Sequence, residues 1–420
     1  MKNLKLFFIL IIFFLIEIGF SYAQNKNIPP KKNVNNCLGC HQHKDEMPDD
    51  FNKEDVHFKA GITCVDCHGG DNTSKKQSIA MDEDNGYLET PTKEELPKFC
   101  GKCHSSSTYM IKHKSKVSTD IVKDYFKSKH GKLLKEGNTD VASCVDCHSA
   151  HSIFNSKNTK SSVYALNIIE TCAKCHDDKE LMTKYDIKTT VVNNYKKSVH
   201  GIALLKKMDV GAPACNDCHG NHGANPKGKK KVVEICGDCH VNNMDLFAQS
   251  KMSKEDDFDA KHGCIACHTN HLIEKPTDKM IGIQESSLCL DCHDEGDKGY
   301  KIANILHSYL TKLDTTYQYA KNRLKIVVES NMDDVDLNFM LKEVKQSLIK
   351  SRTLIHTFDT TLVGKEVRKG LKLADSTIAK ENEEIHASII RRNGLLIATS
   401  FITLIILALF FISKEMDKKL

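Results

Sequence analysis

The stretch Cys144-Val-Asp-Cys147-His148-Ser-Ala-His151 contains the pattern that decides the fold of this chain, Cys-x-x-Cys-His. The pattern occurs nine times, and the nine copies use all eighteen cysteines of the 420-residue sequence. In chain order the copies are Cys37, Cys40 and His41; Cys64, Cys67 and His68; Cys100, Cys103 and His104; Cys144, Cys147 and His148; Cys172, Cys175 and His176; Cys215, Cys218 and His219; Cys236, Cys239 and His240; Cys264, Cys267 and His268; Cys289, Cys292 and His293.

The spacing of the pattern has a chemical reason. Two thiols three positions apart can each add to one vinyl group of a single haem, and the histidine that follows then lies under the iron as proximal ligand. Paired Cys-x-x-Cys is also zinc-ribbon spacing, but a zinc site gives no reason for a histidine after every second cysteine. The pattern therefore predicts nine covalently bound haem c groups.

The motif-bearing segment, residues 37–299, has too little chain for a conventional apolar core. It offers about 29 residues per motif, aromatic residues make up 7% of the chain, and Trp is absent. The porphyrins must then supply most of the buried apolar area. We expect a mainly α fold with extensive loop, in which short helices carry the motifs and the polypeptide wraps a haem stack.

The N-terminal residues resemble an export signal. Residues 1–23 combine a basic start, an apolar run and the small-residue site Ser21-Tyr22-Ala23, which predicts a secretory signal peptide. An uncleaved N-terminal anchor is the alternative. Residues 24–36 are polar, contain a Pro pair and predict a linker.

A second apolar run, residues 394–412, has nineteen residues without a charge, which is long enough to span a bilayer as a helix. Basic residues flank it on both sides, so the positive-inside rule does not orient it. The signal peptide does: the haem domain lies in the periplasm or extracytoplasmic space, and residues 413–420 form a cytoplasmic tail. The alternative is a buried helix of a soluble protein.

The formal charge of +5 describes only the polypeptide. Two propionates on each of nine haems would move the net charge to about −13. The apparent basicity therefore gives no support to nucleic-acid binding.

After the first motif, the other eight form four pairs that behave as a repeat. The second repeat has Tyr125-x-x-Ser-x-His130-Gly before one motif, His151 three residues after that motif, and then another motif. The third copies it with His200 and His222. The first has His57 but carries Asp71 where the later histidine is expected, and the fourth has His271.

The fourth repeat differs at its upstream position. Phe247-x-x-Ser-x-Met252 aligns with Tyr-x-x-Ser-x-His, so a methionine stands where the histidine is expected. His262 is also available, but only two residues before Cys264. A haem with Met and His ligands would have a higher potential than its bis-His neighbours. Ordinary packing of Met252 is the alternative.

From residue 300 cysteine is absent and an apolar period near 3.6 begins. It predicts three helices in residues 300–393, with a break at Asn331-Met-Asp-Asp and a third helix whose start Gly364 and Gly370 weaken. The pattern indicates an antiparallel helical bundle that acts as a stalk and continues into the membrane span.

The remaining question is whether any iron keeps an open face, because an iron with two protein ligands passes electrons while an open one can reduce a small substrate. Twelve histidines lie outside the motifs, which is enough to close nine sixth positions. The candidates are His57, His130, His151, His200, His222 and His271 from the repeat, Met252 or His262, and His307 and His356 from the predicted bundle, with His43, His113 and His386 as the other histidines that could complete the set.

On these motifs the chain resembles the multihaem c-type cytochromes with doubled CxxCH motifs, the cytochrome c-three-like superfamily, and in particular its membrane-tethered members in anaerobic respiratory chains. The resemblance implies electron transfer between a membrane quinol pool or a membrane quinol-oxidising complex and a periplasmic or outer-membrane cytochrome. The quinol-oxidising tetrahaem members are anchored at the N-terminus, whereas this chain has its predicted anchor at the C-terminus.

Two functions follow from these patterns. The first is a chain of closely spaced haems that transfers electrons. The second is an oxidoreductase of the hydroxylamine-oxidising or nitrite-reducing kind, which needs one open haem, with Tyr309, Tyr317 or Tyr319 as candidates for a nearby tyrosine.

Overall fold

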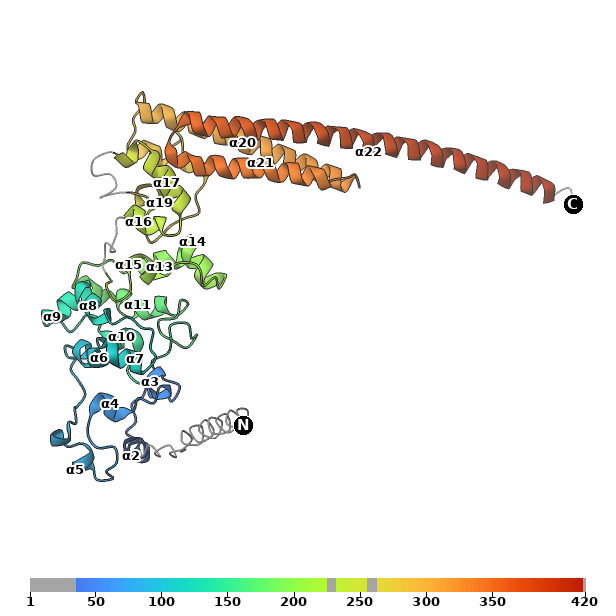
Figure 1. The fold of residues 1–420 in the computed structure, drawn as a ribbon. Helices are drawn as coiled ribbons and strands as arrows, with labels where there is room; N and C mark the ends of the chain where they lie inside the picture. The colour runs from blue at the N-terminus through green and yellow to red at the C-terminus, as the bar shows by residue number, and fades with distance from the viewer. Residues whose placement is uncertain (1–34, 225–231, 255–262, 418–420) are drawn as a thin grey trace, which may run out of the picture. The chain divides into compact units, whose positions relative to one another are not determined.

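A computed structural model describes residues 35–224, 232–254 and 263–417. Every regular element in these ranges is a helix, which confirms the mainly α fold with extensive loop (Figure 1). The signal peptide, residues 24–34 of the linker, His262 and residues 418–420 lie outside the described residues. The chain forms two compact units, residues 1–122 with 133–164, and residues 123–132 with 165–420.

The first unit is built from short helices joined by loops, most of which carry or flank a motif. The elements wholly within it are α2 (Asn36–Lys44), α3 (Val56–Lys59), α4 (Cys64–His68), α5 (Gln77–Ala80), η1 (Glu83–Asn85), α6 (Leu96–His104), α7 (Ser107–Lys112) and α10 (Cys144–His148). Two further helices, α8 (Ile121–Lys127) and α9 (Lys129–Lys135), each have residues in both units.

The motif-bearing part of the second unit follows the same plan. Its elements are α11 (Ile168–His176), α12 (Lys179–Thr183), α13 (Thr190–Lys197), α14 (Val199–Gly201), η2 (Ile202–Lys206), α15 (Cys215–His219), α16 (Val232–Gly237), α17 (Val241–Gln249), η3 (Met252–Lys254), α19 (Ile265–His268), η4 (Asp278–Met280) and η5 (Leu288–Asp291). Its compact apolar cluster is small, with Ile169, Val192, Leu204 and Ala214 buried together. So small a cluster agrees with the expectation that this chain has little apolar core of its own.

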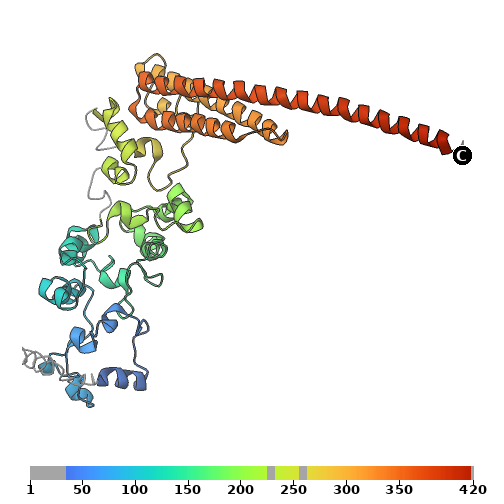
Figure 2. The same cartoon turned by 45° about the vertical axis from the view of Figure 1, so that its right-hand side comes forward.

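The second unit ends in three long helices, α20 (Lys298–Glu329), α21 (Val335–Leu354) and α22 (Thr360–Asp417), which lie side by side in both views (Figures 1 and 2). Their apolar stripes meet in two clusters, one around Leu306, Leu310 and Val363 and one around Val327 and Leu337. The predicted break is present, because Asn331 has a φ of 52° between α20 and α21. The antiparallel bundle predicted from the 3.6-residue period is therefore confirmed.

The two glycines near the predicted start of the third helix do not interrupt it. Helix α22 begins at Thr360 and runs through Gly364 and Gly370 without interruption. A Cβ on Gly370 would lie 2.7 Å from the Ser347 hydroxyl and 3.0 Å from the Leu313 methyls. The residue thus gives up helix propensity in order to let α20 and α21 approach α22 closely.

Helix α22 continues beyond the bundle through the apolar run 394–412. It is the one helix among the described residues that is long and apolar enough to cross a membrane, and its apolar segment packs against nothing in the structure. Large side chains there, such as Leu395, Phe401 and Phe411, are about two-thirds exposed. An exposed apolar helix of this length is compatible with a single-pass membrane anchor, and it does not fit the alternative of a buried helix.

Candidate haem sites

Three of the four motifs that open a pair share one local structure. In α4, α10 and α15 the first cysteine begins a five-residue helix, and the aspartate at the third helical position accepts the backbone N–H of the residue before the helix. These N–H to carboxylate distances are 2.6 Å for Asp66, 2.6 Å for Asp146 and 2.7 Å for Asp217. The aspartate of Cys-x-Asp-Cys-His therefore fixes where the motif helix starts.

All four motifs that open a pair end alike. The residue after the histidine has a positive φ in all four: 68° at Gly69, 62° at Ser149, 85° at Gly220 and 59° at Thr269. This turn stops the helix one residue after the histidine. The later histidine of the repeat follows two residues on, so the turn determines the direction in which His151 and His271 leave the motif.

The upstream histidines of the first three repeats also share one geometry. Each occupies the second position of a short helix whose N-cap is a buried polar residue, and the N-cap side chain accepts a backbone N–H of the helix. The N-cap and histidine pairs are Asp55 with His57, Ser128 with His130 and Ser198 with His200. The sequence pattern revealed the serine framework but not Asp55, because an aspartate caps a helix as a serine does and yet is a different residue type.

Each upstream segment lies against the tail of the following repeat. The backbone N–H of Val56 donates to the carbonyl of Ile153 at 2.9 Å, Lys129 to Ala224 at 3.1 Å and Val199 to Ile273 at 2.8 Å. Each accepting residue lies two positions after the later histidine of the next repeat. Successive repeats are thus interleaved in space rather than placed end to end.

The interleaving brings histidine rings together in pairs of nearly constant separation. In the first unit the centroid distances are 5.9 Å for His57 and His104 and 6.3 Å for His68 and His151. In the second unit the pairs are His130 with His176 at 6.2 Å, His200 with His240 at 6.2 Å, His219 with His271 at 5.9 Å and His268 with His356 at 6.3 Å. Every pair joins one motif histidine to one histidine outside the motifs.

The separation matches two imidazoles on opposite faces of one iron. A metal–imidazole bond is about 2 Å long and the ring centre lies about 1 Å beyond the nitrogen, so two such rings have centres about 6 Å apart. Rings that stack face to face in direct contact lie closer, as Tyr109 and His113 do at 4.5 Å. The paired histidines therefore fit a haem iron between them, with the cysteines of the motif as the attachment points.

The ring nitrogens have the partners expected of metal ligands. The Nδ1 of His151 lies 3.0 Å from a carboxylate oxygen of Asp50, and the Nδ1 of His356 lies 2.9 Å from the carbonyl of Thr353. On the motif side, the Nδ1 of His41 is 3.1 Å from the carbonyl of Glu46 and the Nδ1 of His293 is 3.1 Å from Asp297. A partner on Nδ1 orients the ring and leaves Nε2 for the metal.

Electrostatics keep several of these rings in the metal-binding form. Burial lowers the pKa of five of these histidines, His68, His176, His200, His268 and His271. A neighbouring histidine lowers the pKa of each one further. At His68 alone, a backbone hydrogen bond acts in the opposite direction and raises the pKa. The neutral imidazole is the form that ligates a metal.

The cysteine sulfurs of successive motifs are also neighbours. Each pair of neighbours joins a cysteine of one motif to a cysteine of the next motif in the same unit. In every such pair of cysteines, one thiol shifts the pKa of the other, so the two sulfurs lie near one another. In the first unit the pairs are Cys37 with Cys64, Cys67 with Cys103 and Cys100 with Cys144. In the second unit they are Cys172 with Cys215, Cys218 with Cys236, Cys236 with Cys264 and Cys267 with Cys289. Within each unit, every motif is therefore adjacent to the next one along the chain.

Other predicted candidates lie elsewhere. His307, on α20, places Nδ1 3.3 Å from the carbonyl of Asp278 and Nε2 3.3 Å from the Thr311 hydroxyl. Tyr309 and Tyr317 pack against the bundle clusters, and Tyr319 lies under the Arg323 guanidinium. The three tyrosines thus have structural roles in the bundle.

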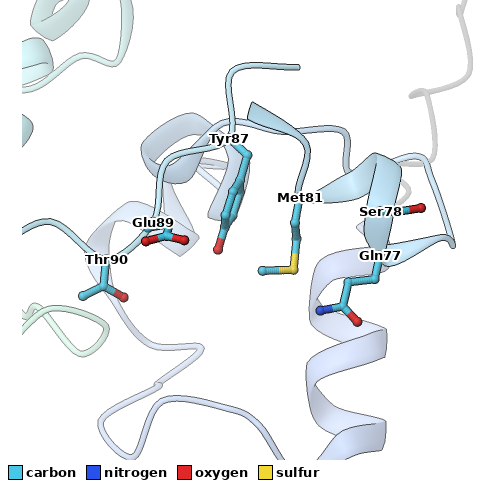
Figure 3. Close-up of a pocket in the computed structure, with 6 residues that line it drawn as sticks. All are labelled: Gln77, Ser78, Met81, Tyr87, Glu89 and Thr90. Carbon is cyan, nitrogen blue, oxygen red and sulfur yellow. The ribbon is translucent and has the colours of Figure 1, made fainter. Parts of the chain in front are cut away.

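An open hollow of about 850 Å³ lies beside the first motif helix (Figure 3). It is lined by Gln77, Ser78, Met81, Tyr87, Glu89 and Thr90. Lys44 of α2 donates to Gln77 at 3.1 Å and so ties the motif helix to this rim. The volume is in the range of ligand sites, but the hollow is open to solvent, whereas such sites usually enclose most of the ligand surface.

Comparisons with known proteins agree with these observations. The family model of cytochrome c3 matches residues 56–177, and that of cytochrome c554 and c-prime matches residues 20–69. The cytochrome c-type protein NrfB of Haemophilus influenzae is 29% identical over an alignment 150 positions long, which covers 30% of this chain. The match spans 65% of the length of that relative. No solved structure matches the chain.

Proposed function

Because the chain is a multihaem c-type cytochrome, we propose that it carries electrons through nine covalently bound haems, with no chemistry of its own on a substrate. The donor side is a membrane quinol pool or a membrane quinol-oxidising complex, and the acceptor is a periplasmic or other extracytoplasmic cytochrome of an anaerobic respiratory chain. The observation that carries the proposal is the set of six histidine pairs, because an iron held from both faces exchanges electrons and cannot bind a substrate.

The pairs support a specific assignment of sixth ligands. The upstream histidine of a repeat serves the second motif of the same repeat: His57, His130 and His200 serve the irons of His104, His176 and His240. The later histidine serves the first motif of the preceding repeat: His151 and His271 serve the irons of His68 and His219. His356 serves the iron of His268, and His222 remains a predicted ligand.

This assignment gives a reason for Asp71. A histidine there would serve the first motif of a preceding pair, and the chain has only a single motif, that of His41, before the first repeat. It also gives a reason for His356, since no fifth repeat follows to supply the ligand for His268. Helix α17 packs against η6 (Ile355–Thr357), so the bundle takes the place of the missing repeat.

The adjacency of the sulfurs supports transfer along the chain. Thioether sulfurs lie at the edge of the porphyrin, so neighbouring sulfurs bring neighbouring haem edges together within each unit. Anchoring by residues 394–412 would hold this series of haems on the outer side of the cytoplasmic membrane, in line with export by residues 1–23.

The test uses the full-length protein purified in detergent with its haems. Haem content and intact mass should give nine haems per chain, and the ferric protein should be low-spin and bind carbon monoxide only weakly when reduced. His57→Ala should convert one haem to high spin, whereas the control His113→Ala, whose ring stacks on Tyr109, should leave the spectrum unchanged. A high-spin haem in the unmodified protein that turns over hydroxylamine or nitrite would overturn the proposal in favour of an oxidoreductase.

A further inference from the structure

The fourth repeat builds the same support as the others but places a methionine on it. Ser250 is 1% exposed, as are Ser128 and Ser198. Its backbone dihedrals are −70° and 159°, against −68° and 165° at Ser198. The two segments therefore have the same local conformation at the N-cap.

The hydrogen bonds of the two segments agree as well. The N–H of Ser250 donates to the carbonyl of Phe247 at 2.9 Å, and the N–H of Ser198 donates to that of Tyr195 at 3.0 Å. The N–H of Ser253 donates to the Ser250 hydroxyl at 3.1 Å, and that of Gly201 donates to the Ser198 hydroxyl at 3.0 Å. Met252 thus stands at the position of His200, two residues after a buried capping serine.

The position identifies the iron that Met252 would serve. In the other three repeats this residue belongs with the second motif of its own repeat, and the second motif of the fourth repeat is that of His293. The first motif of this repeat, that of His268, already has His356 opposite its ring at 6.3 Å. We propose that the thioether sulfur of Met252 is the sixth ligand of the iron held by His293. This inference rests on the proposed haem chain and gives the haem of His293 a sixth ligand that is not a histidine.

The chemistry of the thioether sets the consequence. A methionine sulfur is a soft, neutral ligand that favours ferrous over ferric iron, so a haem with His and Met ligands has a higher potential than a bis-His haem. The motif of His293 ends four residues before Asp297, the N-cap of α20. The highest-potential haem therefore lies at the bundle end of the chain of motifs, where it acts as a local electron sink.

His307 is the competing ligand, since α20 contacts η5 of the same motif. Both nitrogens of its ring already face polar atoms, the carbonyl of Asp278 and the hydroxyl of Thr311. Those contacts hold the ring within its own helix and the η4 segment, which favours Met252.

The test is optical and electrochemical, on the full-length haem-loaded protein in detergent. The ferric protein should show the weak long-wavelength charge-transfer band of a methionine-ligated haem, equivalent to one haem, and magnetic circular dichroism in the near infrared should count it. Met252→Ala should abolish the band and convert one haem to high spin. Met252→His should abolish the band, keep all haems low-spin and lower the highest midpoint potential. The control is Met208→Ala, at an exposed loop position that is 61% accessible, which should change nothing.

Two further variants identify the haem that gives rise to the charge-transfer band. The double variant Cys289→Ala, Cys292→Ala should lose one haem and the band together, whereas Cys264→Ala, Cys267→Ala should lose one haem and keep the band. A native protein without the band, or a high-spin haem produced by His307→Ala and not by Met252→Ala, would overturn the inference. Both results are compatible with nine low-spin haems in the native protein, whereas a failure of the proposed electron-transfer function would show a high-spin haem in the native protein.

Discussion

Glu381 gives the bundle a pH dependence that can be measured. Its side chain is completely buried in α22, neither carboxylate oxygen has a hydrogen-bond partner, and the Arg323 Nε lies 3.9 Å away. The Arg323 guanidinium donates a hydrogen bond to the side chain of Asn382. Burial raises the pKa of Glu381 from 4.5 to about 7, although Arg323 opposes the rise.

The sign follows from linkage. A carboxyl whose pKa is higher in the folded state binds its proton more tightly there, so folding is favoured most below the unfolded pKa and loses stability as the pH rises toward the folded pKa. A rise of the pKa from 4.5 to about 7 corresponds to about 3 kcal/mol at most, so we expect a loss of about 1–3 kcal/mol between pH 4.5 and pH 8.

Glu381→Gln removes the charge at nearly constant shape. We expect the variant to stabilise the bundle at pH 8 by about 1–3 kcal/mol, which is about a 5- to 150-fold lower opening constant, and to change little near pH 4.5. The assay is hydrogen exchange of peptides from 317–329 and 377–390 in the full-length protein, with native and variant compared at each pH. Glu383→Gln, an exposed change of the same charge, is the control. Equal protection of native and Glu381→Gln protein at pH 8 would refute the reasoning.

Three further predictions follow from other features. Gly370→Ala should destabilise the bundle by about 1 kcal/mol, because overpacking outweighs the gain in helix propensity. Gly394→Ala is the control and should not destabilise it, because nothing lies within 4 Å of a Cβ there. The measurement is thermal unfolding followed by circular dichroism, and equal behaviour of the two variants would contradict the prediction. Asp50→Asn should raise the midpoint potential of one haem, because His151 loses an anionic partner that favours ferric iron, and an unchanged redox titration would exclude that role. A chain that ends at residue 393 should keep its full haem content and appear in the soluble fraction; retention in salt-washed membranes would show another attachment.

The sequence predicted those features whose cause is local. Haem attachment follows from three residues in a fixed spacing, and the bundle follows from apolar positions at helical intervals. The break near Asn331 follows from residues that disfavour helix. The duplication of motifs and the equivalence of Met252 with His130 and His200 were also visible, because each repeat keeps the same capping framework.

The sequence did not predict which histidine faces which motif. His151 directly follows the motif of His148 but lies opposite His68, because interleaving of successive repeats is a tertiary property with no local signal. The absence of the later histidine in the first repeat was the one trace of this arrangement. The role of Gly370 was missed for a similar reason, since the need for a glycine there comes from Ser347 and Leu313 on the two neighbouring helices.

The unbroken α22 also sets the distance between the motifs at the bundle end and the apolar run. His356 and the start of α22 lie at the end of the bundle that holds the motif of His268, and the apolar run begins at residue 394. At 1.5 Å per residue, the helix covers about 50 Å between Thr360 and that point. With residues 394–412 in a bilayer, the bundle therefore holds the terminal haems well clear of the lipid headgroups. A quinol dissolved in the membrane would not reach them directly, so electrons from the quinol pool would cross that gap through a partner with a domain of comparable height.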